Sequence, residues 1–167
     1  MSNAARAWDA LARAAATREA AASEARVLRE LLVFSIDGAP YALPIERIRE
    51  IVRPRALTPV PHVPSAVLGV ISLRGEILQV LDTRRRLGLA SVASARSSRV
   101  IVLNGEDGRV TGLLVDAVHE VLRVEERALL PPTHADGGLI TGLAPRGAGF
   151  VSLISPDQLV ELDASAA

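Results

Sequence analysis

A repeat displaced by about 70 residues constrains this 167-residue chain more than any other feature. Both copies contain a turn glycine, an apolar strand-like run and an apolar-x-Glu-apolar-apolar-Arg segment, and both run on into prolines. The first copy has Gly38, Leu43, Ile45, the segment Ile48–Arg53, Pro59 and Pro61. The second copy has Gly108, Leu113, Val115, the segment Val118–Arg123, Pro131 and Pro132. Chance similarity between Val- and Leu-rich strands is the alternative, but the shared Gly, Glu, Arg and Pro positions favour a duplication.

The duplication predicts a mostly β fold made of two small barrels. Short apolar runs alternate with Gly, Pro and Asp, and Asp37-Gly38 is a strong two-residue turn signal. Four or five short strands per copy favour a curled barrel, which hides the sheet edges. Each barrel is marginal alone, so we expect the two to pack side by side over a shared hydrophobic seam, with a binding groove between them. The expected domain spans residues 31–162, with one lobe at roughly 31–89, the other at roughly 99–155, and strands shared between them.

Residues 1–30 differ in composition from the rest of the chain. They are rich in Ala, Arg and Glu and contain no Gly or Pro, and these residue types form helices readily. We therefore expect an N-terminal α-helical extension, with Trp8, Leu11 and Ala15 on one side. A solvated helix is the favoured interpretation, and a docking helix for a partner remains open. Residues 163–167 are expected to form a flexible tail.

Charge and composition argue against several classes of protein. Nineteen basic residues balance nineteen acidic ones, whereas nucleic-acid-binding proteins usually have a basic excess, so no nucleic-acid partner is expected. The absence of cysteine excludes disulfides and thiolate zinc sites. No apolar run approaches the roughly 20 residues that span a bilayer. We therefore expect a cytoplasmic protein without direct membrane insertion.

The sequence offers few residues for catalysis. His62, His119 and His134 lack the spacing of a helical zinc motif and are expected at the surface. Asp82 and Asp116 each follow a strand, and a turn or helix-cap role is favoured over a pair of catalytic carboxylates. Arg84-Arg85-Arg86 is interpreted as a solvated face. The sequence also lacks a nucleophile elbow, a P-loop and a dinucleotide fingerprint, which favours a non-enzymatic binding protein without a cofactor or metal.

An ordered series of motifs resembles the CheW family. In the first half of the chain the similar segments are Glu50–Pro54, Thr58–Pro61, Gly69–Gly75, Val80–Asp82 and Leu87–Leu89. In the second half they are Gly112–Val118, Glu120–Leu122 and Pro131-Pro132. The resemblance extends from about Leu31 to Leu162 and implies two five-stranded SH3-like barrels. It further implies a scaffold without catalytic activity that couples the regulatory domain of a CheA-type histidine kinase to the cytoplasmic tips of chemoreceptors in membrane-associated arrays.

The same resemblance implies a set of partner-binding residues. They are Ile48, Glu50, Gly69, Arg74, Gly75, Val100, Gly112 and Val121. Arg74 matches an arginine tied to receptor and kinase coupling, and Ile48 and Glu50 match receptor-facing positions. The residues that match the inter-lobe groove or its support are Gly69, Val100, Gly112 and Val121. Apolar side chains suit an amphipathic receptor hairpin, and charged ones suit the fixing of its register. Barrel core is the alternative for Val100 and Val121, and a turn is favoured for Gly75.

Two other functions remain open from the sequence. The family's usual Asn before Leu-Arg-Gly is Ser72 here, and the N-terminal helix lies outside the common core. A regulator of a paralogous kinase pathway for motility or development, without standard receptor coupling, is therefore the first alternative. A distant alternative is an enzyme with a cryptic inter-lobe site, which would require His119, Asp116 and Asp82 to converge around a pocket.

Overall fold

Strands make up most of the regular structure in this computed structural model, which describes residues 3–24, 26–134 and 137–162. The helices are α1 (Asn3–Glu24), α2 (Thr83–Arg86) and α3 (Pro156–Val160), with short 3-10 helices at Ile45–Arg47 and Glu126–Ala128. The strands of the first copy are β1 (Leu28–Ile36), β2 (Ala39–Pro44), β3 (Ile48–Val52), β4 (Val67–Leu73) and β5 (Glu76–Asp82). Those of the second copy are β6 (Arg99–Asn104), β7 (Val110–Val115), β8 (Ala117–Glu125), β9 (Ile140–Arg146) and β10 (Gly149–Ile154).

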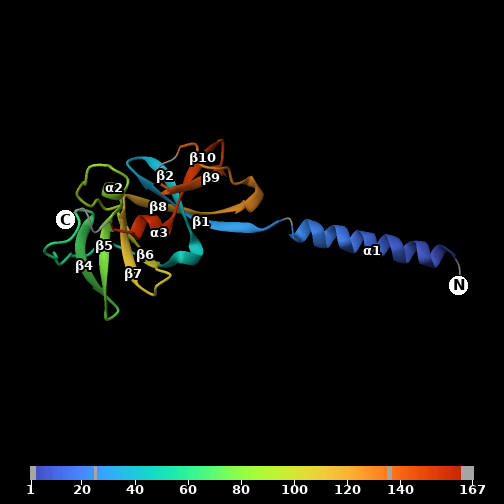
Figure 1. The fold of residues 1–167 in the computed structure, drawn as a ribbon, viewed down its shortest axis with the longest axis horizontal. Coiled ribbons are helices and arrows are strands. Elements are labelled where there is room, and N and C mark those ends of the chain that lie inside the picture. Colours follow the sequence, from blue (N-terminus) through green and yellow to red (C-terminus); the bar gives the residue numbers. More distant parts are fainter. Residues whose placement is uncertain (1–2, 25, 135–136, 163–167) are drawn as a thin grey trace.

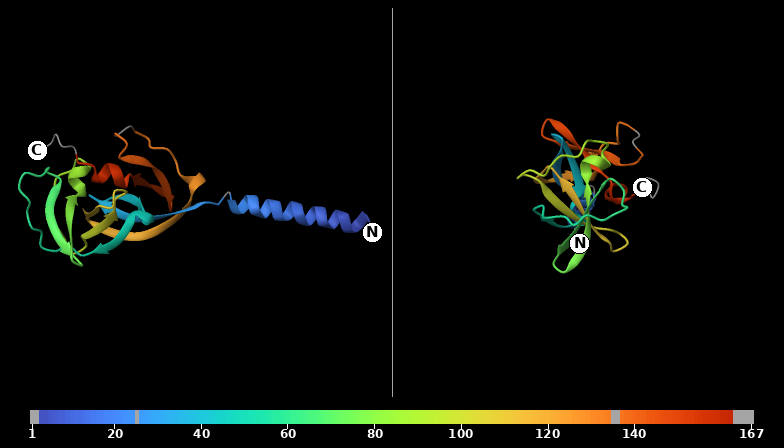
Figure 2. Two further views of the ribbon diagram at one scale, coloured as in Figure 1. Left: turned by 60° about the horizontal axis from the view of Figure 1, so that its bottom comes forward. Right: turned by 90° about the vertical axis from the view of Figure 1, so that its left-hand side faces the viewer.

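Within these residues the strands form two five-stranded sheets that lie side by side (Figures 1 and 2). Sheet A has the order β8-β1-β2-β10-β9, and sheet B has the equivalent order β3-β6-β7-β5-β4. Each sheet therefore takes two strands from one copy of the repeat and three from the other. The two copies meet at the antiparallel pairs β1–β8 and β3–β6 and at the parallel pairs β2–β10 and β5–β7.

This exchange is a sharing of strands between the two ranges that the sequence suggests as lobes. The contiguous ranges 31–89 and 99–155 do not each form one sheet, because β3–β5 complete the β6–β7 hairpin and β8–β10 complete the β1–β2 hairpin. The predicted fold class is confirmed: a mostly β chain with two five-stranded units side by side and an N-terminal helix.

Each sheet curls until the segment after one edge strand reaches the opposite edge strand. In sheet B, Thr58 follows β3 and exchanges two backbone hydrogen bonds of 2.9 Å with Val70 of β4. In sheet A, Leu130 follows β8 and exchanges two of 2.9 Å with Leu143 of β9. Equivalent bridges thus protect the edges of both sheets, as expected for barrels of so few strands.

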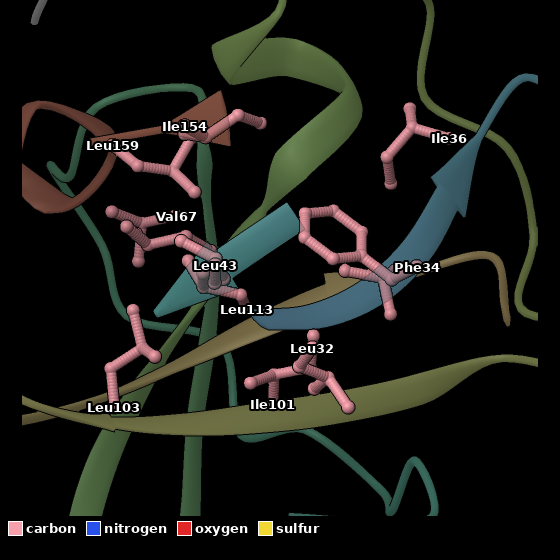
Figure 3. Packing of buried hydrophobic residues seen from close by; sticks show 12 residues of the cluster. Leu32, Phe34, Ile36, Leu43, Val67, Ile101, Leu103, Leu113, Ile154 and Leu159 are labelled. Atoms are coloured by element: carbon pink, nitrogen blue, oxygen red, sulfur yellow. The ribbon is translucent and has the colours of Figure 1, made fainter. Parts of the chain in front are cut away.

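The apolar core of the protein consists of three clusters. One lies within sheet A around Val33 and Val151, and another lies within sheet B around Leu78 and Val102. The largest lies between the sheets and contains side chains from both, which face one another in Figure 3. Its buried members are Leu32, Phe34, Ile36, Leu43, Val67, Leu81, Ile101, Leu103, Leu113, Val115, Ile154 and Leu159. This cluster is the shared seam that two marginal barrels require.

The helical extension is shorter than its composition suggests. Helix α1 ends at Glu24, and residues 28–30, which the sequence places in the extension, are the first residues of β1. They pair with residues 123–125 of β8, and the ion pair between Glu30 and Arg123 spans 2.7 Å. Pairing with a distant strand outweighs local helix propensity here. Among the described helices, none is long and apolar enough to cross a membrane, and the expected flexible tail at 163–167 lies outside the described residues.

Candidate functional site

Glu50 and Arg74, two of the residues singled out from the sequence, lie in contact at the closed edge of sheet B. Arg74 Nη2 is 3.2 Å from Glu50 Oε2, and the arginine side chain is 74% exposed whereas that of the glutamate is 20% exposed. A second ion pair of 2.5 Å joins Arg49 to Glu76 beside it. The β4–β5 turn and strand β3 are thus joined by two crossed charge pairs.

The local backbone explains how these side chains meet. Arg74 and Gly75 form the β4–β5 turn with φ angles of 51° and 83°, the left-handed pair that a tight hairpin requires. In β3 the pairing to β6 shifts between Ile48 and Glu50, which leaves Arg49 as the extra residue of a bulge. A regular strand points neighbouring side chains to opposite faces. The bulge allows Arg49 and Glu50 both to reach the hairpin.

Ile48 and Gly69 lie on the same sheet with different surroundings. Ile48 is half-buried and packs against the inter-sheet cluster. Gly69 has a φ of 144°, and a Cβ there would lie 2.5 Å from the carbonyl oxygen of Thr58. Glycine at this position therefore allows the bridge that closes sheet B. Gly142 allows the equivalent bridge in sheet A, where a Cβ would lie 2.7 Å from the carbonyl oxygen of Leu130.

The remaining predicted residues do not join this surface. Val100 is buried in the core of sheet B, and a Cβ on Gly112 would lie 2.8 Å from its side chain. These two positions pack against each other inside the barrel and do not line a groove. Val121 lies on β8 of sheet A, where it is 46% exposed and pairs with Leu32. Barrel core, the alternative left open by the sequence, thus describes Val100 but not Val121.

A hollow of about 940 Å³ lies beside sheet B, next to Arg47 and helix α3. It is bordered by the start of β5, the β6–β7 hairpin and helix α3, and none of the eight predicted residues lines it. Acidic side chains outnumber basic ones around it. The charged members are Arg47, Glu76, Glu106, Asp107, Arg109, Asp157 and Glu161.

Two bidentate ion pairs hold the segments where the chain crosses from one sheet to the other, and sequence reasoning missed both. Arg84 of α2 donates to Asp116, which lies between β7 and β8, over 3.0 and 2.6 Å. Arg47, between β2 and β3, donates to Asp157 of α3 over 3.0 and 2.5 Å. The sequence analysis interpreted the cluster Arg84-Arg85-Arg86 as a solvated face, but these arginines contact other residues. Arg84 is only 14% exposed, and Arg86 donates to the carbonyls of Leu159 and Gln158.

These pairs change the acidity of both carboxylates. Hydrogen bonds from Arg47 hold the pKa of Asp157 below its ordinary value, against a smaller opposing effect of burial. Burial acts to raise the pKa of Asp116, but hydrogen bonds from Arg84 and the Asp37 amide outweigh it and leave that pKa lowered. Both carboxylates are therefore charged at neutral pH and bound to arginine.

The three side chains that a cryptic enzyme would need, Asp82, Asp116 and His119, each form a contact with another residue instead. Asp82 accepts a hydrogen bond from the Arg84 amide at 2.9 Å and so caps α2, the role favoured from the sequence. Asp116 is bound to Arg84, and His119 Nε2 lies 3.0 Å from the Ser35 hydroxyl. None of the three lines the hollow of about 940 Å³ or a smaller one, of about 280 Å³, beside Leu31, Leu130 and Leu153. Among the described residues there is also no cluster of three or more His, Asp or Glu side chains suited to a metal.

Comparison with known proteins places this architecture in a family. A match to the CheW-like domain covers residues 30–164. The chain belongs to the CheW family. The "Chemotaxis protein CheW" of Rhizobium meliloti is 41% identical over 103 residues, which are 62% of this chain and 66%, just under two thirds, of that protein. "Protein FrzA" of Myxococcus xanthus is 34% identical over 114 residues, or 68% of this chain and 70% of that protein.

A solved CheW structure has the same fold. The scaffolding protein TtCheW from Thermoanaerobacter tengcongensis superposes with a TM-score of 0.77 and 30% sequence identity, over 84% of this chain and 98% of that one. The resemblance drawn from the motifs is therefore confirmed, and the match to the CheW-like domain begins within β1, at residue 30, and excludes α1.

Proposed function

We propose that this CheW-family chain is a non-enzymatic adaptor that couples a CheA-type histidine kinase to chemoreceptors in chemotaxis-like signalling. Membership of the family over residues 30–164 is the observation that carries the proposal. The likeness to a solved scaffolding protein supports it, since that likeness covers both sheets and nearly the whole of the other chain.

The surface at the closed edge of sheet B suits a polar contact with a partner. Arg74 stands at the tip of a hairpin with most of its side chain in solvent, and its pairing with the less exposed Glu50 limits its orientation. An exposed ion pair of this kind adds little to stability, so its charges are available for recognition. Half-buried Ile48 adds apolar area on β3 of the same sheet, and exposed Val121 adds a separate apolar position on β8 of sheet A. We assign Glu50, Arg74 and Gly75 to partner recognition, and Val100 and Gly112 to support of the barrel.

The partners of the proposed adaptor are the regulatory domain of the kinase and the cytoplasmic tip of a receptor. A kinase regulatory domain of the same fold would pair with one barrel, and a receptor hairpin would lie along apolar side chains. The chain would then work in the cytoplasm at membrane-associated receptor arrays.

Co-purification tests the proposal directly. The full chain, carrying an affinity tag, is expressed with each CheA-type kinase and receptor of its source genome, and bound proteins are identified. We expect a stable complex with one kinase and one receptor, and a receptor-dependent rise in kinase autophosphorylation on addition of the chain. Failure to bind any encoded kinase would exclude the proposed role.

A regulator of a paralogous kinase pathway is the second candidate. It is favoured by the similarity to FrzA, a family member that does not carry the CheW name, and by Ser72 on β4 next to the Arg74 turn. A receptor-binding assay separates the two, since only the first function requires contact with a receptor.

A further inference from the structure

Helix α1 is a long helix that packs against no other element among the described residues of its own chain. It extends away from the two sheets (Figure 1), and every side chain from residue 4 to residue 22 is exposed. Trp8 is 73% exposed and Leu11 is 62% exposed. An isolated helix of this length is marginal in water even when rich in alanine, so it gains stability chiefly by packing against something else.

The helix carries one continuous seam with the spacing of a coiled coil. Six positions follow one another at alternating intervals of four and three residues: Ala4, Trp8, Leu11, Ala15, Arg18 and Ala22. This alternation keeps side chains on one side of a helix. The charged residues Arg6, Asp9 and Arg13 lie outside the seam, where solvent can hydrate them.

The seam is complementary to itself only when two copies run in opposite directions. Reversal places Leu11 against Ala15, Trp8 against Arg18 and Ala4 against Ala22. Large side chains then face small ones, and the Arg18 guanidinium can stack on the Trp8 ring with Asp9 next to it. A parallel pair would instead place Arg18 against Arg18 and Trp8 against Trp8, which buries like charges together.

The position of the two sheets also favours an antiparallel pair of helices. Strand β1 begins at Leu28, directly after a short connection from Glu24. Packed helices lie about 8–10 Å apart, so a parallel pair would crowd two domains of β-sheet at one end of the helices. An antiparallel pair places them at opposite ends of helices that are about 33 Å long.

We propose that α1 joins two copies of this chain as an antiparallel helix pair centred between Leu11 and Ala15. The inference does not rest on the function proposed above. The seam is mostly alanine, so the buried area is smaller than that of a standard stable interface, and the dimer forms in a concentration-dependent manner. The pair gives one adaptor unit two identical two-sheet domains that face opposite directions.

The sole tryptophan of the chain reports directly on this contact, since Trp8 lies in the seam. Sedimentation and intrinsic fluorescence of the full chain are measured from micromolar to millimolar concentration. We expect a rise in mass to that of a dimer with a parallel blue shift of the Trp8 emission. A monomer with solvent-exposed emission at every concentration overturns the proposal, as does a dimer in which Trp8 emission does not change.

Cross-linking determines the direction, because the chain has no native cysteine. The variants Ala4→Cys and Ala22→Cys are oxidised separately and as a mixture. The antiparallel pair predicts disulfides mainly in the mixture, between position 4 of one copy and position 22 of the other. Efficient homodimers of Ala4→Cys alone and of Ala22→Cys alone indicate a parallel pair and contradict the proposal.

Matched variants test the seam itself. Arg18→Glu and Leu11→Arg should each raise the dissociation constant by about tenfold or more, since aromatic and arginine residues dominate small interfaces. Arg13→Ala, outside the seam, should change it by less than about threefold. Equal effects of Arg18→Glu and Arg13→Ala would show that the seam is not the interface. Circular dichroism at low concentration verifies that the sheets stay folded in every variant.

Discussion

Arg47 holds Asp157 through two hydrogen bonds of 3.0 and 2.5 Å, and this pair is the charge-reversed counterpart of Arg84 with Asp116. Arg84 and Asp157 are each the second residue of equivalent short helices, α2 and α3. Their partners lie in equivalent crossings, from β7 to β8 and from β2 to β3. The duplicated fold therefore uses the same contact twice, with acid and base exchanged. Each helix is complementary in charge only to the segment that it contacts, and not to the equivalent segment in the other copy.

Charge exchange within one pair tests this relationship. Asp157→Arg places two guanidinium groups together and should destabilise the protein by about 1 kcal/mol, or ~3–5 °C in melting temperature. The double variant Arg47→Asp/Asp157→Arg restores an ion pair and should recover most of the loss. Thermal unfolding followed by circular dichroism measures both. If the loss of stability in the double variant equals the sum of the losses in the two single variants, the contact contributes nothing as a pair.

Acid should remove the contribution of the same pair. The pKa of Asp157 is lowered in the folded state, so its stabilisation is complete above the ordinary value of 3.8 and is lost as pH falls through the folded pKa. At neutral pH the variant Arg47→Gln should melt below wild type. That difference should shrink as the pH falls below 3.8, and melting curves across an acid series measure it. A gap of constant size down to acid unfolding would disagree with this assignment.

Local signals predicted much of the fold, and distant pairing accounts for what they missed. Asp37-Gly38 and Arg74-Gly75 form left-handed turns where the sequence placed turns, since Asp-Gly is a strong turn signal and glycine adopts a positive φ without strain. Which strands are exchanged is invisible to this kind of reasoning, because a strand's own pattern does not specify its neighbour. Residues 28–30 joined β1 for the same reason, since their partners lie in β8.

The same distinction applies to the candidate site. Family motifs brought Glu50 and Arg74 forward, but their contact depends on closure of sheet B, which joins strand β3 to the β4–β5 turn. The Arg47–Asp157 pair spans 110 positions and has no local signature. One signal was available: alignment of the two copies through their helices places Arg84 opposite Asp157, two opposite charges at one repeat position.

Closure of the two sheets depends on glycine at two equivalent positions. Gly69→Ala and Gly142→Ala would each press a Cβ against a backbone carbonyl, and we expect a loss of about 1–3 kcal/mol from each. Gly149→Ala is the control, since the nearest atom to its Cβ outside the adjoining residues would be 4.0 Å away, and it should stay within about 0.5 kcal/mol. Urea unfolding gives the three values. Indistinguishable stabilities would mean that the bridges tolerate a side chain.

Removal of α1 should leave the sheets folded. A chain that begins at residue 27 retains the Val27 carbonyl, which accepts a hydrogen bond of 2.8 Å from the Glu126 amide, and all of β1. Its melting temperature at low protein concentration should match that of the full chain. A chain that begins at residue 31 loses three pairs between β1 and β8 and should melt lower. A large drop for the first truncation would show that α1 supports the sheets.

Charge reversal at Arg74 separates recognition from folding. The side chain is mostly solvated, and glutamate at a φ of 51° is no more strained than arginine, so Arg74→Glu should stay within about 0.5 kcal/mol of wild type. It should weaken binding to the kinase or receptor by about tenfold, because a partner that reads the positive charge meets two carboxylates instead. Arg109→Glu, at another exposed hairpin, is the control and should bind normally.

The swap Glu50→Arg/Arg74→Glu restores the internal ion pair but should remain defective, because the partner contacts the exposed tip. Calorimetry measures binding, and melting curves are recorded for every variant. Recovery of binding in the swap would show that Arg74 acts by supporting β3. An unfolded Arg74→Glu protein would show that the residue is structural.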